Sequence, residues 1–199
     1  MLQKLVIATS NPHKVEEIEA VLGQIGIACV PMGDAGIPEP EEDGATFEEN
    51  ARIKAVAYAR ALGTTVLADD SGLEVDALGG APGVHSARYA GIGATRAERD
   101  AANNARLLRE LEQVPDARRT ARFVCVLCIA REDGTIVAES RGAFDGVIGR
   151  AQRGTNGFGY DPLLVLPDGR TSAELSPSEK NARSHRGNAL RAMVAKLRA

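Results

Sequence analysis

Short apolar segments alternate with capped helices along the first half of this chain, and this order limits the folds that the chain can adopt. Strands are predicted over 5–8, 25–30 and 65–69, because each is a short apolar run bounded by turn-forming residues. Asn11 followed by proline is a typical helix start, and Thr46 begins a capping box that predicts a second helix to about residue 62. The first half therefore has the pattern of an α/β protein.

The second half of the sequence adds a β-hairpin to this pattern. After a Gly/Pro-rich segment over 72–93, a capping box at Thr95 predicts a helix to about residue 111. The elements predicted after it are hairpin strands over 122–131 and 135–144, a glycine-rich loop over 149–159, a strand over 163–166 and helix from 176 to about 198. Alternation followed by a hairpin predicts a mixed-sheet α/β or α+β layered fold, and 199 residues are expected to form a single domain over 1–199.

Composition excludes several classes of protein. No apolar run reaches the roughly 20 residues of a membrane span, and the first residues lack the pattern of a signal peptide. Cys125 and Cys128 are three apart in an apolar strand and face opposite sides, so buried thiols are expected rather than a zinc or redox pair. Residues 151–199 are net basic and the remainder net acidic, without a basic stripe carrying aromatics. We expect a cytoplasmic protein with no membrane and no nucleic-acid partner.

Two adjacent carboxylates, Asp69 and Asp70, follow the apolar residues of the 65–69 strand. Like charges side by side repel, and burying them unpaired is costly. A divalent metal ion would stabilise such a pair at a strand end. A solvated Asp-Asp-Ser-Gly turn is the alternative that these four residues alone favour.

The first strand leads into a turn suited to an anion. Backbone N–H groups at a helix N-terminus and the helix dipole favour negative charge, and polar side chains gather there: Thr9, Ser10, Asn11, Pro12, His13 and Lys14. Ordinary helix capping with Lys14 in solvent is the alternative. The chain lacks both the Walker P-loop and the G-x-G-x-x-G fingerprint.

Three further segments carry candidate residues. The acid-rich loop over 39–49 offers second ligands for a metal, since Mg²⁺ needs only a few carboxylates. The segment over 157–162 sets aromatic rings between glycines, which suits stacking on a planar ligand, although a tight turn with buried rings has the same pattern. Basic residues then gather near the C-terminus, at Lys180, Arg183, His185 and Arg186; most such clusters are solvated faces.

Taken in order, these segments resemble the inosine triphosphate pyrophosphatase family over essentially the whole chain. The motifs are Thr9-Ser10-Asn11-Pro12-His13-Lys14, Thr46-Phe47-Glu48-Glu49-Asn50-Ala51 with Lys54, Ala68-Asp69-Asp70-Ser71-Gly72-Leu73, Gly79-Gly80-Ala81-Pro82-Gly83, Ser86-Ala87-Arg88-Tyr89, Gly157-Phe158-Gly159-Tyr160-Asp161-Pro162, Glu179-Lys180 and Ser184-His185-Arg186-Gly187. The resemblance implies an elongated mixed sheet with flanking helices, forming two lobes around a central nucleotide cleft. It also implies Mg²⁺-dependent hydrolysis of ITP, dITP and XTP to the monophosphate and pyrophosphate, and a homodimer. The resemblance leaves open which of ITP, dITP and XTP is the preferred substrate.

With this resemblance, the residues can be given catalytic roles. Asp70 is expected to activate the attacking water and to bind the metal. Glu41 is the favoured second metal ligand, with Glu42 and Asp69 as alternatives. Cations are expected to neutralise the triphosphate, since most of the catalysis should be electrostatic; they are Lys14, Lys54 and Lys180. Ser71 is expected to contact the substrate beside the metal.

Base recognition is expected from hydrogen-bond polarity. Hypoxanthine and xanthine present a 6-oxo acceptor and an N1–H donor, and adenine presents the reverse. Asp161 is expected to accept from N1–H, and His185 or Arg186 to donate to the 6-oxo group. Phe158 is expected to stack on the ring, within the loop that also holds Gly159 and Tyr160.

Three other functions are compatible with parts of the pattern. A Maf-like nucleotide pyrophosphatase is disfavoured by the 157–161 loop and by Ser184-His185-Arg186. A haloacid-dehalogenase phosphatase would need an Asp-x-Asp nucleophile, which Asp69-Asp70-Ser71 does not supply. A nucleotide-binding regulator without turnover is disfavoured by the intact acids and lysines, and an assay of pyrophosphate release separates it from the enzyme.

Overall fold

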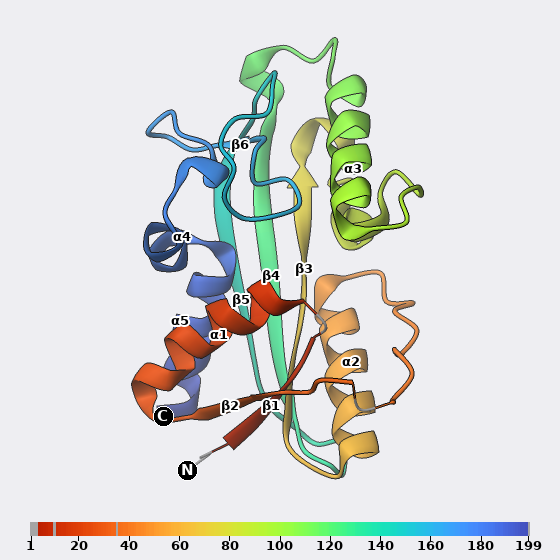
Figure 1. The fold of residues 1–199 in the computed structure, drawn as a ribbon, viewed down its shortest axis with the longest axis vertical. Helices are drawn as coiled ribbons and strands as arrows, with labels where there is room; N and C mark the ends of the chain where they lie inside the picture. Colours follow the sequence, from red (N-terminus) through yellow and green to blue (C-terminus); the bar gives the residue numbers. More distant parts are fainter. Residues whose placement is uncertain (1–3, 10, 35, 199) are drawn as a thin grey trace. The chain divides into compact units, whose positions relative to one another are not determined.

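The computed structural model describes residues 4–9, 11–34 and 36–198, and it contains a six-stranded sheet flanked by helices (Figure 1). The strand order is β2-β1-β3-β4-β5-β6. The strands are β1 (Lys4–Ala8), β2 (Ala28–Pro31), β3 (Val66–Val75), β4 (Thr120–Ala130), β5 (Ile136–Ile148) and β6 (Leu164–Val165), and the helices are α1 (Pro12–Leu22), α2 (Phe47–Leu62), α3 (Arg96–Glu110), α4 (Pro177–Arg183) and α5 (His185–Arg198). β1 pairs with β2 and β3 in parallel, whereas β5 and β6 are antiparallel. The predicted mixed α/β class is confirmed.

The helix starts follow the capping signals in the sequence. Asn11 caps α1 by accepting a hydrogen bond from the N–H of His13, with proline at the first helical position. Thr46 and Thr95 form complete capping boxes at α2 and α3. All three predicted helix starts are confirmed.

Two predicted strands have different bounds in the structure. The strand expected over 25–30 begins at Ala28, because a 3₁₀ turn follows α1 and ends at Gly26, whose φ of 77° is left-handed. The strand expected to end at residue 69 runs on to Val75, so Asp69 and Asp70 lie within β3 and not at its end. The cause is the buried pair Leu73 and Val75, which continues the alternation of a strand past the polar residues.

The second half keeps the predicted order of elements. The turn at Asp133-Gly134 joins β4 to β5, with Gly134 at a positive φ of 89°. The helix expected from 176 to 198 is divided into α4 and α5, which meet at Ser184. Cys125 and Cys128 are free and buried on β4, as expected for core thiols.

The chain divides into two compact units. Unit 1 comprises residues 1–70, 125–143 and 184–199, and unit 2 comprises 71–124 and 144–183. In unit 1, alternate residues of β1 and β4 pack with α1 and α5 in one apolar core; its members include Leu5, Ile7, Ile18, Leu22, Leu67, Cys125, Leu127, Ile129, Leu190 and Met193. The sheet residues in this list are two apart in each strand, so this core marks one face of the sheet in unit 1.

Unit 2 has its own apolar core. Its members include Leu73, Val75, Leu107, Leu111, Phe123, Phe144, Ile148, Tyr160, Leu163, Leu164 and Leu175. α3 contributes Leu107, and Leu111, which caps the C-terminus of α3, follows it one turn later. Across the described ranges, every helix is too short or too polar to cross a bilayer.

Candidate active site

Asp69 and Asp70 lie on β3 just beyond Ala68, where its pairing with β1 ends. Successive side chains of a strand point to opposite faces. Asp69 shares a face with Leu67, which packs in the core with α1 and α5. Asp70 points the other way and contacts Lys54 of α2. The two adjacent carboxylates therefore have separate surroundings.

Asp69 is held by two cations. Its Oδ2 lies 2.8 Å from Lys14 Nζ on α1 and 3.3 Å from the guanidinium of Arg186 on α5. Arg186 is fully buried and also pairs with Glu17, one turn beyond Lys14. Burial by itself would raise the pKa of Asp69, but Lys14 and Arg186 outweigh it and hold the pKa below its ordinary range. Asp69 therefore stays ionised near neutral pH and holds both cations in place.

Asp70 has a less complete set of partners. Its Oδ1 accepts from Lys54 Nζ at 2.8 Å, and the same ammonium lies 3.3 Å from Glu42. Its Oδ2 is buried and has no hydrogen-bond partner among the described residues. Burial raises the pKa of Asp70 above its ordinary value, although Lys54 opposes the shift. An oxygen of this kind is available to a proton donor or a cation.

The turn before α1 is arranged around Asn11. Thr9 Oγ1 accepts from the Asn11 N–H, and Asn11 Oδ1 accepts from the His13 N–H. The Nδ2 of Asn11 is buried and has no partner within the part of the chain that the structure describes. His13 is about half exposed and lies near Glu16. Ser10 lies outside the described residues.

These ion pairs form two sets in unit 1, one around Asp69 and one around Lys54, and we define the charged cluster as both together: Lys14, Glu17, Glu42, Lys54, Asp69, Asp70 and Arg186. Within it the carboxylates outnumber the cationic groups. Glu42, one of the three alternatives for a second acid, belongs to it, whereas Glu41 is exposed on the loop. The described residues contain no group of three or more acidic, histidine or cysteine side chains placed to hold a metal ion.

The predicted aromatic loop lies in unit 2 and is organised by Asp161. Asp161 Oδ2 accepts from the Phe158 N–H at 2.8 Å and from Lys180 Nζ at 2.7 Å, and Oδ1 accepts from the Ser172 hydroxyl at 2.7 Å. The carboxylate is buried, with 2% of the residue exposed. These bonds define a structural role for Asp161 in the loop; its contact with a base N1–H stays a prediction.

Phe158 presents a half-buried ring next to two cations. Lys180 Nζ lies 4.9 Å from the ring centroid, and the guanidinium of Arg96 lies 4.7 Å from it. Tyr160 is buried, and its hydroxyl donates to the Ser86 carbonyl. The ring of Tyr160 thus belongs to the core, whereas that of Phe158 contacts cations at the loop, and the stacking of Phe158 on a base stays a prediction.

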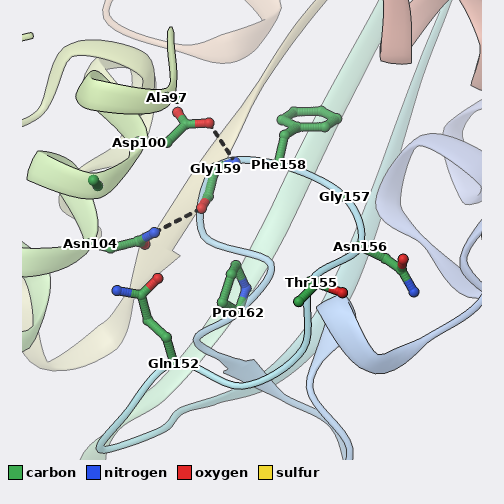
Figure 2. A pocket seen from close by; sticks show the side chains of 11 residues that line it. Ala97, Asp100, Asn104, Gln152, Thr155, Asn156, Gly157, Phe158, Gly159 and Pro162 are labelled. Atoms are coloured by element: carbon green, nitrogen blue, oxygen red, sulfur yellow. Dashed lines mark hydrogen bonds between the residues drawn. The ribbon is translucent and has the colours of Figure 1, made fainter.

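Helix α3 supports this loop through residues that the sequence pattern did not single out (Figure 2). Asp100 accepts from the Gly159 N–H and Asn104 donates to the Gly159 carbonyl, each at 3.0 Å. Their spacing of four along α3 is the signal that could have identified them, because it places them on one helix face. Glu17 could have been identified in the same way, because it lies three residues after Lys14 and therefore on the same helix face.

Of the remaining predicted residues, His185 is the buried first residue of α5 in unit 1. Ser71 follows Asp70 on β3 and begins unit 2. The structure therefore gathers Lys14, Lys54 and Asp70 with Arg186 in one unit, and Phe158 with Asp161 and Lys180 in the other.

The protein therefore belongs to a class that combines a mixed α/β fold with a buried charged cluster and an aromatic loop. Comparisons with known proteins identify its family. The sequence model of the Ham1 family matches residues 5–196, and the chain belongs to this family. A curated relative from Exiguobacterium sibiricum, named dITP/XTP pyrophosphatase, is 52% identical over 98% of this chain and 96% of its own length. One from Methylococcus capsulatus with the same name is 50% identical over 100% of this chain and 98% of its own.

Solved structures agree with this assignment. A HAM1 protein from Coxiella burnetii superposes with a TM-score of 0.87 at 43% identity, covering 100% of this chain and 99% of the other. A Staphylococcus aureus Ham1 protein gives a TM-score of 0.84 at 39% identity, with 98% of each chain covered. The resemblance predicted from the motifs is confirmed at the level of the family.

Proposed function

We propose that this protein hydrolyses the triphosphates of deaminated purine nucleosides (ITP, dITP and XTP) to the monophosphate and pyrophosphate. Its membership of the Ham1 family and the names of its close relatives support the substrate class. The observation that carries the chemistry is Asp70. It has a buried oxygen with no partner in the described structure, a raised pKa and a lysine on its other oxygen.

The reaction forms a bond between a water oxygen and the α-phosphorus and breaks the bond from that phosphorus to the bridging oxygen. Asp70 Oδ2 would take the proton of the attacking water, while Lys54 holds Oδ1 and fixes the orientation of the carboxylate. Pyrophosphate leaves with the bridging oxygen. Because its pKa is raised toward neutral pH, the Asp70 carboxylate is a stronger base than that of an exposed aspartate.

Charge neutralisation would come from the lysines near the site and from the start of α1. Lys14 lies near the N-terminus of α1, where backbone N–H groups and the helix dipole favour phosphate oxygens. The Nδ2 of Asn11, which has no hydrogen-bond partner among the described residues, supplies a further donor at the same turn. Because Asp69 holds Lys14 in place, the cation is already ordered before substrate binds.

The residues present fit a magnesium ion. The free Oδ2 of Asp70 is the oxygen donor that Mg²⁺ prefers, and Mg²⁺ at phosphates usually takes only one or two carboxylates, with water and phosphate oxygens completing its shell. Asp70 would hold it, with Glu41 or Glu42 as the second carboxylate. When bound, the ion supplies positive charge next to the phosphate oxygens. It would also balance the excess of carboxylates in the charged cluster.

The base would be recognised by the aromatic loop. We propose that Phe158 stacks on the purine, with Lys180 beside it, and that His185 or Arg186 donates to the 6-oxo group. A homodimeric assembly and a cytoplasmic location complete the proposal and rest on the resemblance to the family.

Pyrophosphate release from purified protein tests the proposal. ITP, dITP, XTP, GTP and ATP are compared in Mg²⁺ and in excess chelator, with Asp70→Asn as the matched variant. Mg²⁺-dependent release that is fast for the deaminated purines and about 100-fold slower in the variant is expected. Binding of ITP with no pyrophosphate released would instead identify a nucleotide-binding regulator.

A further inference from the structure

Three residues of α3 form a stripe that contacts the aromatic loop. Arg96, Asp100 and Asn104 are spaced by four and therefore lie on one face of the helix. The guanidinium of Arg96 lies over the Phe158 ring at 4.7 Å, and Arg96 is 3.9 Å from Asp100. Asp100 and Asn104 then bind the next residue of the loop, Gly159. The stripe therefore contacts two consecutive residues of the loop, Phe158 and Gly159.

The two hydrogen bonds fix the backbone that carries the Phe158 ring. Gly159 has a φ of 62° and lies outside any helix or strand, so its N–H and carbonyl need partners other than a ladder. Asp100 takes the N–H and Asn104 the carbonyl. Asn104 is buried, with only 3% of the residue exposed.

A cavity lies beside this contact (Figure 2). Its volume is about 260 Å³, and Asp100, Asn104, Gln152, Thr155 and Pro162 are among its lining residues. Side chains do not fill this space, so close packing does not hold the loop there. The hydrogen bonds from α3 therefore contribute more to the loop position than they would in a packed core.

We propose that Asp100 and Asn104 are positioning residues for the base subsite: they hold Gly159, and through it the Phe158 ring, in the place where a purine stacks. This inference rests on the proposed function, because it concerns the same subsite. Arg96 completes the stripe by restricting the ring itself. A base bound equally in the ground state and the transition state changes KM and not kcat, so loosening this stripe should appear in KM.

The test compares Asp100→Ala with Asp100→Asn in pyrophosphate release from dITP. Asp100 is partly exposed, so both variants should fold. The alanine variant loses the acceptor for the Gly159 N–H, and KM is expected to rise about tenfold with kcat within about twofold. The asparagine variant keeps an amide oxygen as acceptor and should restore KM to within about threefold of the original protein, although the ion pair with Arg96 is lost.

Two further measurements separate positioning from a general loss of structure. Arg109→Ala, in the exposed last turn of the same helix, should leave both constants unchanged. Hydrogen exchange of the 155–160 amides, measured without nucleotide, should be faster in Asp100→Ala and in Asn104→Ala than in the original protein. A fall in kcat at constant KM, unchanged KM, or unchanged exchange would each overturn the inference. If the original protein releases no pyrophosphate, the proposed function fails, while the exchange experiment still decides whether α3 holds the loop.

Discussion

Replacing each of the two adjacent aspartates by asparagine should have very different effects on stability. Asp69→Asn removes a charge that pairs with two cations, Lys14 at 2.8 Å and the buried Arg186 at 3.3 Å. Asp70→Asn removes a charge that the fold already disfavours, as its raised pKa shows. Lys54 keeps Glu42 at 3.3 Å and can still donate to the amide oxygen at position 70.

The magnitudes follow from burial. Asp69 has a side chain only 1% exposed, and removing one partner of a buried ion pair costs about 3–5 kcal/mol. For a protein of this size each kcal/mol lowers Tm by about 2–4 °C, so Asp69→Asn should lower Tm by roughly 10 °C. For Asp70→Asn, Tm should stay within about 2 °C or rise slightly, since the folded state stabilises the neutral form relative to the unfolded chain.

Thermal unfolding by circular dichroism at pH 7, with urea unfolding as a second measure, compares the variants. Asp70→Asn should combine a nearly unchanged Tm with a loss of pyrophosphate release of about 100-fold. Equal destabilisation by both variants would refute the assignment of separate surroundings to the two carboxylates. An Asp69→Asn variant that is as stable as the original protein would also refute this assignment.

Three other predictions use pH, backbone space and a buried guanidinium. Burial raises the pKa of Asp70 in the free protein, so kcat/KM should fall as the pH drops through that raised pKa, and Asp70→Asn should remove this acid-side fall from the pH profile. Gly72→Ala would place a Cβ 2.6 Å from the Gly83 carbonyl oxygen and should cost about 1–3 kcal/mol in urea unfolding, whereas Gly23→Ala, with no atom within 4 Å, should cost much less. Arg119→Met leaves three carbonyl acceptors without their donor, two of them in buried hydrogen bonds, and should cost about 3 kcal/mol by the same measure; a change below about 1 kcal/mol would contradict it.

Local signals in the sequence predicted local structure well. The caps at Asn11, Thr46 and Thr95 placed three helix starts, because a cap depends on a few neighbouring residues. The end of β3 was predicted wrongly, since turn-forming residues were given more weight than the buried alternation of Leu73 and Val75. Tertiary packing overrode local preference at that position.

Contacts between distant segments could not be predicted from spacing. The pairing of Glu17 with Arg186 joins α1 to α5, and nothing in either segment alone specifies the other. The same holds for Asn104 and the carbonyl of Gly159. Family resemblance supplied the set of residues, whereas the partners of each residue required the structure.

The adjacent carboxylates show how strand geometry can resolve an electrostatic problem. Repulsion between neighbouring charges suggested one shared cation, but the side chains of Asp69 and Asp70 point to opposite faces of β3. Each therefore meets cations from different helices: Lys14 and Arg186 on one face, Lys54 on the other. Asp69 keeps a lowered pKa, and Asp70 retains an oxygen that has no hydrogen-bond partner in the described part of the chain. It follows that one carboxylate of the pair, and not both, is available for a water proton or a metal ion.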